Sequence, residues 1–557
     1  MARTTPAGRG ARTSKNVLML IGGTYHPFEA CAEIARKFLA ASGRYELTVT
    51  EDRNVLAGPL KKFDAVIIYT CGGKLSAGQE AGLVKYVTDG GGLVAVHAAN
   101  VISDDNKDYI ALIGSRFDTH PRDPLHIDVK ITDASHPATT RLSDFSVVEE
   151  LYALKNLAPD IRVLATTAYN SAEMPVMYCR QAGKGRVFYT SLGHSTRHWE
   201  LSSFQRSLLH GLDWAAGTQP LRTGPIRCAI LGYGPSFNMG RHHAKLINAT
   251  EGLTAIGACD IDPARIKAAR DDFPSFRTWP NADKMLADPD VDLVVSILPH
   301  NIHAEYAVKC LKAGRHVITE KPFCVTLKEA DAMIAAAKAK GVMLTCYHNR
   351  RWDGDFCTIR RMIRQGLIGE VFEISCGFAD YQKPGRWWRS DKAISGGNLY
   401  DWGAHFTDWV LQLIPEKIAS IQGFFQKKVW AQATNEDHTQ AIIRFANGAM
   451  ADIVFSSISA APRPRWRILG TAGAILDDRT VEKGCQVMTY ENGQIVQRQV
   501  KWDAGISDEY YHNIADHLLL GDELMIKPQE ARRVISVIEY AERSSKAGTS
   551  MPIPGEA

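Results

Sequence analysis

IRCAILGYG, residues 226–234, is an apolar run that ends in two glycines, and it indicates the fold of the longer part of the chain. Such a run is typical of a buried parallel strand that leads into a tight turn before a helix. Four further apolar runs follow, with helical patterns between them, at residues 253–262, 291–299, 316–322 and 342–348. Strands that alternate with helices predict a doubly wound α/β domain, whose ligand site lies at the carboxyl ends of the strands.

Beyond residue 346 the pattern changes to segments in which apolar and polar residues alternate. They are EVFEISCGFADY (370–381), QAIIRFANGAMADIVFSS (440–457) and RWRILGTAGAIL (465–476). A period of two residues is typical of antiparallel strands. We therefore expect an antiparallel sheet in an α+β domain over residues 347–557.

The first part of the chain shows its own strand–helix alternation. KNVLMLIGG (15–23), FDAVIIYTCGG (63–73) and GLVAVHAAN (92–100) have the character of buried parallel strands that end in small residues. We expect an α/β domain at 15–216 after a disordered tail at 1–14. A linker rich in Gly, Pro and Thr follows at 217–225, and the second α/β domain occupies 226–346.

The composition is that of an ordinary globular protein and excludes several classes of function. The 557 residues are 45% hydrophobic and 23% charged, with 65 basic against 61 acidic residues. Because this balance is nearly neutral, we expect neither nucleic acid nor a membrane as a partner. The eleven cysteines contain no C-x-x-C pair, which favours a reducing compartment and predicts a cytoplasmic protein.

The glycines after the strand at 226–231 form a candidate dinucleotide site. Gly232 and Gly234 are followed by Gly240, with three residues more than the usual G-x-G-x-x-G spacing allows. Asp260 ends the second strand, where a carboxylate binds the adenosine ribose and repels a 2′-phosphate, so NAD is favoured over NADP. A glycine turn in another kind of α/β domain is the alternative at this point.

Two further motifs stand at strand ends and at the start of a helix. The strand at 316–319 is followed by Glu320-Lys321-Pro322, and SILPHNIH (296–303) closes the strand before it. GGNLYDWGAHFTDW, residues 396–409, places Asp401 and His405 four residues apart, hence on one face of a helix.

With these motifs, residues 226–550 resemble the Gfo/Idh/MocA oxidoreductases. The resemblance implies an NAD-binding Rossmann domain, a substrate and oligomerisation domain with an open, mostly antiparallel sheet, and a homo-oligomer, either a dimer or a tetramer. It implies that Lys321 acts on the substrate oxygen, that His405 is the base and that Asp401 orients the substrate. The cofactor contacts it implies are Gly232, Gly234, Gly240, His243, Asp260, Pro299, His303, Glu320 and Lys321.

Three functions are consistent with these candidate site residues. The leading hypothesis is NAD-dependent oxidation of a ring hydroxyl of a sugar or glycoside, with C3 as an attractive position because a 3-keto group acidifies the C2 proton. The alternative is a redox-neutral NAD-dependent glycosidase, which oxidises, eliminates, adds water and reduces again on one cofactor. The second alternative is an NAD-bound sensor or scaffold.

Residues 15–216 resemble the trehalose-utilisation (ThuA-like) family, whose fold is similar to the flavodoxin-like class I glutamine amidotransferases. The matching segments are GGTYHPF, YVTDGGGLVAVHAAN, SHPAT, VVEELY and GKGRVFYTSLGHSTRHW. The resemblance points to carbohydrate processing. His97 stands where an amidotransferase needs its cysteine nucleophile, so we expect no glutaminase activity.

The histidines of this domain predict a second site. His26, His97, His136, Glu150 and His194 could gather as an acid–base site or as the ligands of a divalent transition metal. A metal site, a metal-free polar site and a purely structural domain all remain open from the sequence.

Overall fold

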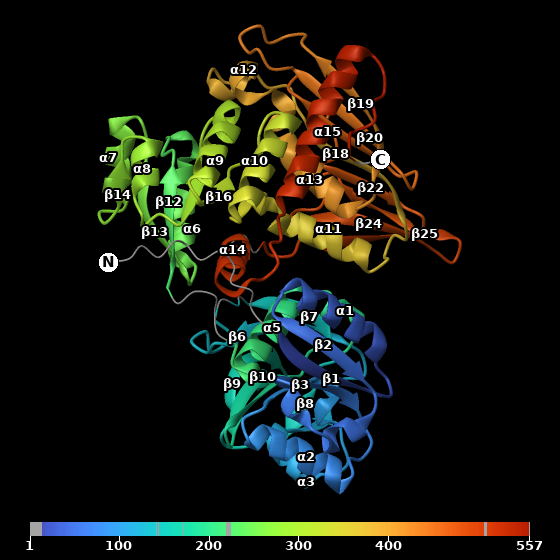
Figure 1. Ribbon diagram of the computed structural model, residues 1–557. Helices are drawn as coiled ribbons and strands as arrows, with labels where there is room; N and C mark the ends of the chain where they lie inside the picture. The colour runs from blue at the N-terminus through green and yellow to red at the C-terminus, as the bar shows by residue number, and fades with distance from the viewer. Residues whose placement is uncertain are drawn as a thin grey trace. The chain divides into compact units, whose positions relative to one another are not determined.

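The computed structural model describes residues 14–140, 142, 144–170, 172–218, 224–505 and 509–555. They form two compact units: residues up to 223 with Ala515–Glu523, and residues 224–514 with 524–557 (Figure 1). The expected tail lies outside the described residues except for Ser14, and so does the linker over 219–223. No helix within the described ranges is long and apolar enough to cross a membrane.

The first unit is built on a nine-stranded sheet in the order β2-β1-β3-β4-β11-β10-β9-β6-β7. Its strands are β1 (Lys15–Gly23), β2 (Tyr45–Thr50), β3 (Ala65–Cys71), β4 (Gly92–Val96), β6 (Leu125–Ile131), β7 (Phe145–Glu149), β9 (Arg162–Tyr169), β10 (Ala172–Ala182) and β11 (Gly185–Thr190). The strands from β2 to β11 in this order pair in parallel, and the others pair antiparallel. The apolar runs of β3 and β4 are buried along their whole length, as expected for central parallel strands.

Smaller elements complete this unit. A two-stranded sheet pairs β5 (Arg116–Thr119) with β8 (Ala153–Lys155). The helices are α1 (Phe28–Ala41), α2 (Ala77–Thr88), α3 (Lys107–Ile113), α4 (Thr196–Trp199) and α5 (Ser202–Ala216). β4 ends in a sharp turn, because the next residue, His97, takes a positive φ of 50°.

The second unit opens with a six-stranded, entirely parallel sheet in the order β14-β13-β12-β15-β16-β17. Its strands are β12 (Ile226–Leu231), β13 (Leu253–Cys259), β14 (Arg277–Trp279), β15 (Leu293–Ser296), β16 (His316–Thr319) and β17 (Leu344–Cys346). The helices between them are α6 (Met239–Ala249), α7 (Pro263–Asp272), α8 (Ala282–Ala287), α9 (His303–Lys312) and α10 (Leu327–Lys340). β14 is absent from the sequence prediction because its three residues form no apolar run.

An eight-stranded sheet follows in the order β19-β20-β21-β18-β22-β23-β24-β25. Its strands are β18 (Val371–Ala379), β19 (Ile418–Gln426), β20 (His438–Phe445), β21 (Met450–Ser456), β22 (Trp466–Gly470), β23 (Gly473–Asp477), β24 (Gly484–Glu491) and β25 (Gln494–Lys501). All neighbours pair antiparallel except β18 and β21. The predicted fold class, two α/β domains and a mostly antiparallel sheet, is confirmed.

Helices from residue 354 onward complete this part of the chain. They are α11 (Gly354–Arg364), α12 (Lys392–Ser395), α13 (Trp402–Leu413) and α15 (Pro528–Ala547), while α14 (Glu509–Leu520) is divided between the two units after Ile514. α13 and α15 contact each other, and Figure 1 shows both along the sheet. Phe406 and Trp409 of α13 pack their rings against Trp466 of β22, at centroid distances of 5.4 Å each.

A buried ion pair fixes the rotation of α13. Arg351 donates to both carboxylate oxygens of Asp408, with Nε–Oδ2 and Nη2–Oδ1 distances of 2.8 and 2.6 Å. Although burial alone would raise the pKa of Asp408, the guanidinium holds it below its usual value. Since Asp408 lies one turn beyond His405, the same contact determines where His405 points.

We expect Asp408→Asn to lower the free energy of unfolding by about 3 kcal/mol, because it removes the two-pronged charged partner of the buried Arg351 guanidinium and leaves only Glu530 to balance its charge. Calorimetric unfolding of the variant and the parent protein measures this. Glu491→Gln, which removes the exposed partner of Arg498 in the same unit, is the control and should leave the transition unchanged. Equal transitions for Asp408→Asn and the parent would contradict the assigned role.

Candidate active sites

The glycine turn after β12 combines two tightly packed positions with one open position. Gly232 has φ +95°, and a Cβ there would lie 2.1 Å from the carbonyl oxygen of Ile297. A Cβ on Gly240 would lie 2.6 Å from the ring of Tyr233, so α6 packs closely against the turn. A Cβ on Gly234 would meet nothing within 4 Å. Gly232 and Gly240 therefore allow close packing, and Gly234 leaves space for a bound group.

Asp260 lies beside this turn. Its Oδ2 accepts a hydrogen bond from the backbone N–H of Tyr233 at 2.7 Å, and its Oδ1 accepts one from Asp262 at 2.9 Å. A carboxylate at the end of the second strand, next to a glycine turn, fits the ribose of a dinucleotide. The residues present thus fit a nicotinamide dinucleotide.

The residues inserted into the glycine turn reach aromatic side chains of the substrate domain. Phe237 and Asn238 take positive φ angles of 58° and 50°. The ring of Phe237 meets that of Trp387 edge-on at 5.7 Å, and the guanidinium of Arg389 lies 5.2 Å from the Phe237 ring. This contact connects the turn to the segment that precedes α12.

Lys321, Asp401 and Arg389 form a charged cluster in the second unit. Lys321 Nζ lies 2.5 Å from Asp401 Oδ1 and Arg389 Nη1 lies 2.7 Å from the same oxygen. Although burial alone would raise the pKa of Asp401, the two cations hold it well below its ordinary value. The carboxylate therefore stays ionised and holds the Lys321 ammonium in place.

His405 lies one turn beyond Asp401 on α13 and is buried. Burial, reinforced by the positive charge of Lys321, holds the pKa of His405 well below its ordinary value. A neutral imidazole can accept a proton. The predicted trio of Lys321, Asp401 and His405 is thus brought to one part of the fold, between the end of β16 and the start of α13.

The structure adds two residues that the predicted set omits. Arg389 holds Asp401, as described above. His300 Nδ1 donates to the Ser395 carbonyl at 2.8 Å, while its buried Nε2 has no hydrogen-bond partner among the described residues. Arg389 lies in an aromatic-rich segment without characteristic spacing, so the sequence offered no signal for it.

Two of the predicted cofactor residues have both ring nitrogens occupied by protein groups. His243 contacts Glu320 Oε1 at 2.9 Å and Tyr511 Oη at 2.6 Å. His303 contacts the carbonyl oxygens of Pro322 and Leu298, each at 2.8 Å. Both ring nitrogens of each residue are therefore engaged by the protein itself. Pro299 opens the short turn that leads to His303.

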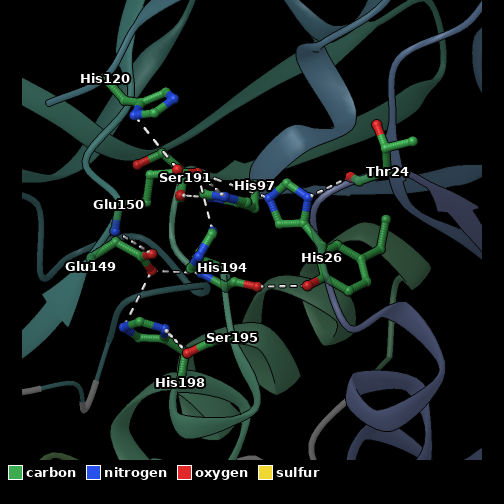
Figure 2. Close-up of polar contacts among 12 residues, drawn as sticks. Thr24, His26, His97, His120, Glu149, Glu150, Ser191, His194, Ser195 and His198 are labelled. Atoms are coloured by element: carbon green, nitrogen blue, oxygen red, sulfur yellow. Dashed lines mark hydrogen bonds and ion pairs between the residues drawn. The ribbon is translucent and has the colours of Figure 1, made fainter. Parts of the chain in front are cut away.

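Three histidines of the first unit converge on one carboxylate (Figure 2). Glu150 Oε2 lies 3.9 Å from His26 Nε2, 3.4 Å from His97 Nε2 and 3.1 Å from His194 Nδ1. The residues follow the ends of β1, β4, β11 and β7. Three of these strands belong to the parallel part of the sheet, so their carboxyl ends lie at the same edge.

Backbone carbonyls determine which ring nitrogens carry protons. His97 Nδ1 lies 2.6 Å from the Ser191 carbonyl, and His26 Nδ1 lies 3.1 Å from that of Thr24. These nitrogens must donate, which leaves a lone pair on each Nε2 unless the ring is doubly protonated. Burial opposes double protonation, because it lowers the pKa of His26 to about 4 and that of His97 below its ordinary value.

His136 does not join this cluster, which corrects the predicted set. Its Nε2 lies 3.3 Å from Cys179 Sγ, its Nδ1 faces the backbone N–H of Ala138, and its ring packs on Trp214. The side chain therefore stabilises its own turn and the neighbouring helix α5. Adjacency to a strand end in the sequence did not show on which side of the sheet the ring would lie.

Two other groups adjoin the cluster and are missing from the predicted set. His120 Nδ1 lies 3.5 Å from Glu150 Oε1. Glu149 accepts a hydrogen bond from the Gly193 N–H at 2.8 Å, and its Oε2 lies 3.4 Å from His198 Nε2. Burial raises the pKa of Glu149 to about 8. Glu149 could have been included from the sequence, because it stands next to Glu150.

Comparisons with known proteins agree with this architecture. A family model described as trehalose utilisation (ThuA) matches residues 16–215. Models of the oxidoreductase family with an NAD-binding Rossmann fold and of the GFO/IDH/MocA C-terminal domain match residues 226–348 and 356–476. The uncharacterized oxidoreductase C115.03 of Schizosaccharomyces pombe is 32% identical over 262 residues, which cover 45% of this chain and 70% of the relative.

The chain belongs to the Gfo/Idh/MocA oxidoreductase family. The predicted fusion to a ThuA domain is confirmed. Another member, scyllo-inositol 2-dehydrogenase (NADP(+)) IolW of Bacillus subtilis, is 28% identical over 58% of this chain and 94% of its own length. Among solved structures, the NAD-binding protein from Listeria innocua is 27% identical with a TM-score of 0.52, and it covers 59% of this chain and 98% of its own.

The three glycine environments predict different effects of the same substitution. Gly234→Ala should leave thermal unfolding unchanged and weaken dinucleotide binding at least tenfold, because its methyl group enters the open space. Gly232→Ala should lower the unfolding temperature, because φ is positive and the Ile297 carbonyl is too close. Calorimetry and titration with NADH measure both. Unchanged NADH affinity in Gly234→Ala would place the dinucleotide elsewhere.

Proposed function

We propose that the second unit oxidises a ring hydroxyl of a sugar or related polyol with NAD as the hydride acceptor. The observation that carries the proposal is the 2.5 Å contact between Lys321 and Asp401, with neutral His405 one turn along the same helix. The relatives named as inositol dehydrogenases, IolW and the Thermotoga maritima myo-inositol 2-dehydrogenase, support a ring alcohol as the substrate class.

Oxidation of an alcohol removes a hydride from carbon and a proton from oxygen. NAD, when bound, supplies the hydride acceptor. The Lys321 ammonium stabilises negative charge that develops on the substrate oxygen. His405, held neutral by burial, accepts the hydroxyl proton. Asp401 keeps the ammonium in place and is itself held by Arg389.

The proposed cofactors are NAD for the second unit and a divalent metal ion for the first. The Asp260 carboxylate beside the glycine turn supports NAD, because it would repel the 2′-phosphate of NADP. IolW, a relative, is named as NADP-linked, so members of the family differ in this choice. The convergence of three imidazoles on Glu150 supports the metal.

A redox-neutral glycosidase that starts with oxidation at C3 is the second candidate. The contact of Phe237 with Trp387 favours it, because a covered glycine turn would retain the cofactor through a full cycle of oxidation and re-reduction. The sensor or scaffold hypothesis is less favoured, since binding alone needs neither an ammonium paired with a carboxylate nor a buried neutral base.

We propose a homo-oligomer, a dimer or tetramer, acting on a small carbohydrate in the cytoplasm. All eleven cysteines are free thiols and ten of them are buried, which suits a reducing compartment.

Lys321→Met should lower turnover at least about 100-fold, because it removes the charge that stabilises the substrate oxygen. Absorbance at 340 nm with NAD and inositols or glucosides measures this. Lys267→Met, on the exposed face of α7, is the matched control.

The same assay separates the candidates. Accumulating NADH supports the dehydrogenase, and sugar release without lasting absorbance supports the glycosidase. Unchanged turnover in Lys321→Met would overturn the assigned chemistry.

Asp260→Ser should raise kcat/KM for NADP relative to NAD at least tenfold, because the carboxylate no longer repels a 2′-phosphate. Steady-state kinetics with both cofactors measure the ratio. Asp262→Ser, which retains an oxygen to cap α7 two residues away, is the control and should leave the ratio unchanged. An unaltered ratio in Asp260→Ser would place the ribose away from this carboxylate.

A further inference from the structure

We propose that His26, His97, Glu150 and His194 form a mononuclear transition-metal site with one side open to solvent, which takes a vicinal hydroxy ketone as its ligand. The choice of ligand rests on the proposed function, because oxidation of one hydroxyl in a ring of adjacent hydroxyls gives this group. The site itself is argued from the first unit alone.

The donor atoms already have the arrangement that a cation requires. One ligand atom from each of the four residues lies within 4.8 Å of the others. His26 Nε2, His97 Nε2 and His194 Nδ1 are buried, and no hydrogen-bond partner for them occurs in the described part of the chain. The lone pairs on Nε2 of His26 and His97 face the Glu150 carboxylate and repel it, and buried polar atoms without a partner are costly. A cation among them removes both penalties.

The surrounding contacts are those that orient metal ligands. Ser191 and Thr24 hold His97 and His26 through the ring nitrogen that faces away from Glu150. Hydrogen bonds of this kind fix the tautomer of a metal-binding histidine. Glu149 accepts the N–H groups of Glu150 and Gly193, and so it holds the two loops that carry Glu150 and His194.

The donor set indicates the class of metal. Three imidazole nitrogens and one carboxylate oxygen suit Zn²⁺, Fe²⁺, Co²⁺, Ni²⁺ or Mn²⁺. Mg²⁺ and Ca²⁺ prefer oxygen ligands and fit poorly. We therefore expect a divalent first-row transition metal.

Exposure shows that the site is closed on one side and open on the other. The side chains of His97 and His26 are 0% and 2% exposed and form its floor. Glu150 and His194 are 17% and 26% exposed, and His120, which contacts Glu150, is 36% exposed. A structural metal is normally enclosed by four ligands, whereas a catalytic metal keeps a position for water or substrate. Access from the His120 side therefore indicates the second kind.

A hydroxy ketone fits such a position. Its carbonyl and hydroxyl oxygens stand on adjacent carbons and can bind one metal ion together. A metal also polarises a carbonyl oxygen more strongly than it does an alcohol.

Cobalt binding to the full-length protein tests the metal site. Protein treated with a chelator should bind one Co²⁺ per chain with visible ligand-field bands. Glu150→Gln and His26→Ala should weaken binding more than about 100-fold, since loss of an outer contact alone typically costs 10- to 100-fold. His126→Ala, an exposed histidine on β6, is the control and should bind as the parent does. Thermal unfolding shows whether each variant folds.

Absence of stoichiometric Co²⁺ binding by the parent, or equal binding by folded Glu150→Gln, would overturn the metal site. In a second measurement, 1,3-dihydroxyacetone should shift the Co²⁺ bands and glycerol should not. Equal responses would overturn the hydroxy-ketone ligand. These readouts need no turnover, so a failed NADH assay would refute the proposed oxidation and leave the spectral result intact.

Discussion

Parallel strands that end at one edge of a sheet bring together side chains that lie far apart in the chain, and both units depend on this constraint. In the first unit β1, β4 and β11 deliver His26, His97 and His194 to one edge. In the second unit β12 leads into the glycine turn, and β16 leads into Lys321. Helix α13, packed on the other sheet, then supplies His405, and Asp401 is the residue just before its first turn.

Each of the two sites holds a partly buried carboxylate, but the charges that surround the two carboxylates differ. Asp401 has its counter-charges in the chain, because Lys321 and Arg389 both contact one of its oxygens. Glu150 instead faces His26 and His97, whose imidazoles burial keeps neutral. In the first arrangement the charge of the carboxylate is balanced by side chains of the protein itself. The second lacks positive charge at its centre, which is why it suits a cation.

Several expectations from residue patterns hold at the level of elements and fail at the level of side chains. The alternating strands, the glycine turn and the helix carrying Asp401 and His405 were predictable, because each depends on local periodicity or on short spacing. The orientations of His136, His243 and His303 were not. Each ring is engaged by atoms from distant segments, such as Cys179 for His136 and Tyr511 for His243. No spacing along the chain encodes these contacts.

The sequence by itself determined the two kinds of domain, the family and the residues that carry charge at the strand ends, since hydrophobic periodicity and short motifs are properties of neighbouring residues. Only the tertiary structure decided which of those residues meet. It joined Arg389 to Asp401, placed His120 and Glu149 beside Glu150, and removed His136 from the cluster. The physical reason is that burial, hydrogen bonding and charge pairing depend on contacts between distant segments. Those segments approach one another only when the sheets and helices pack.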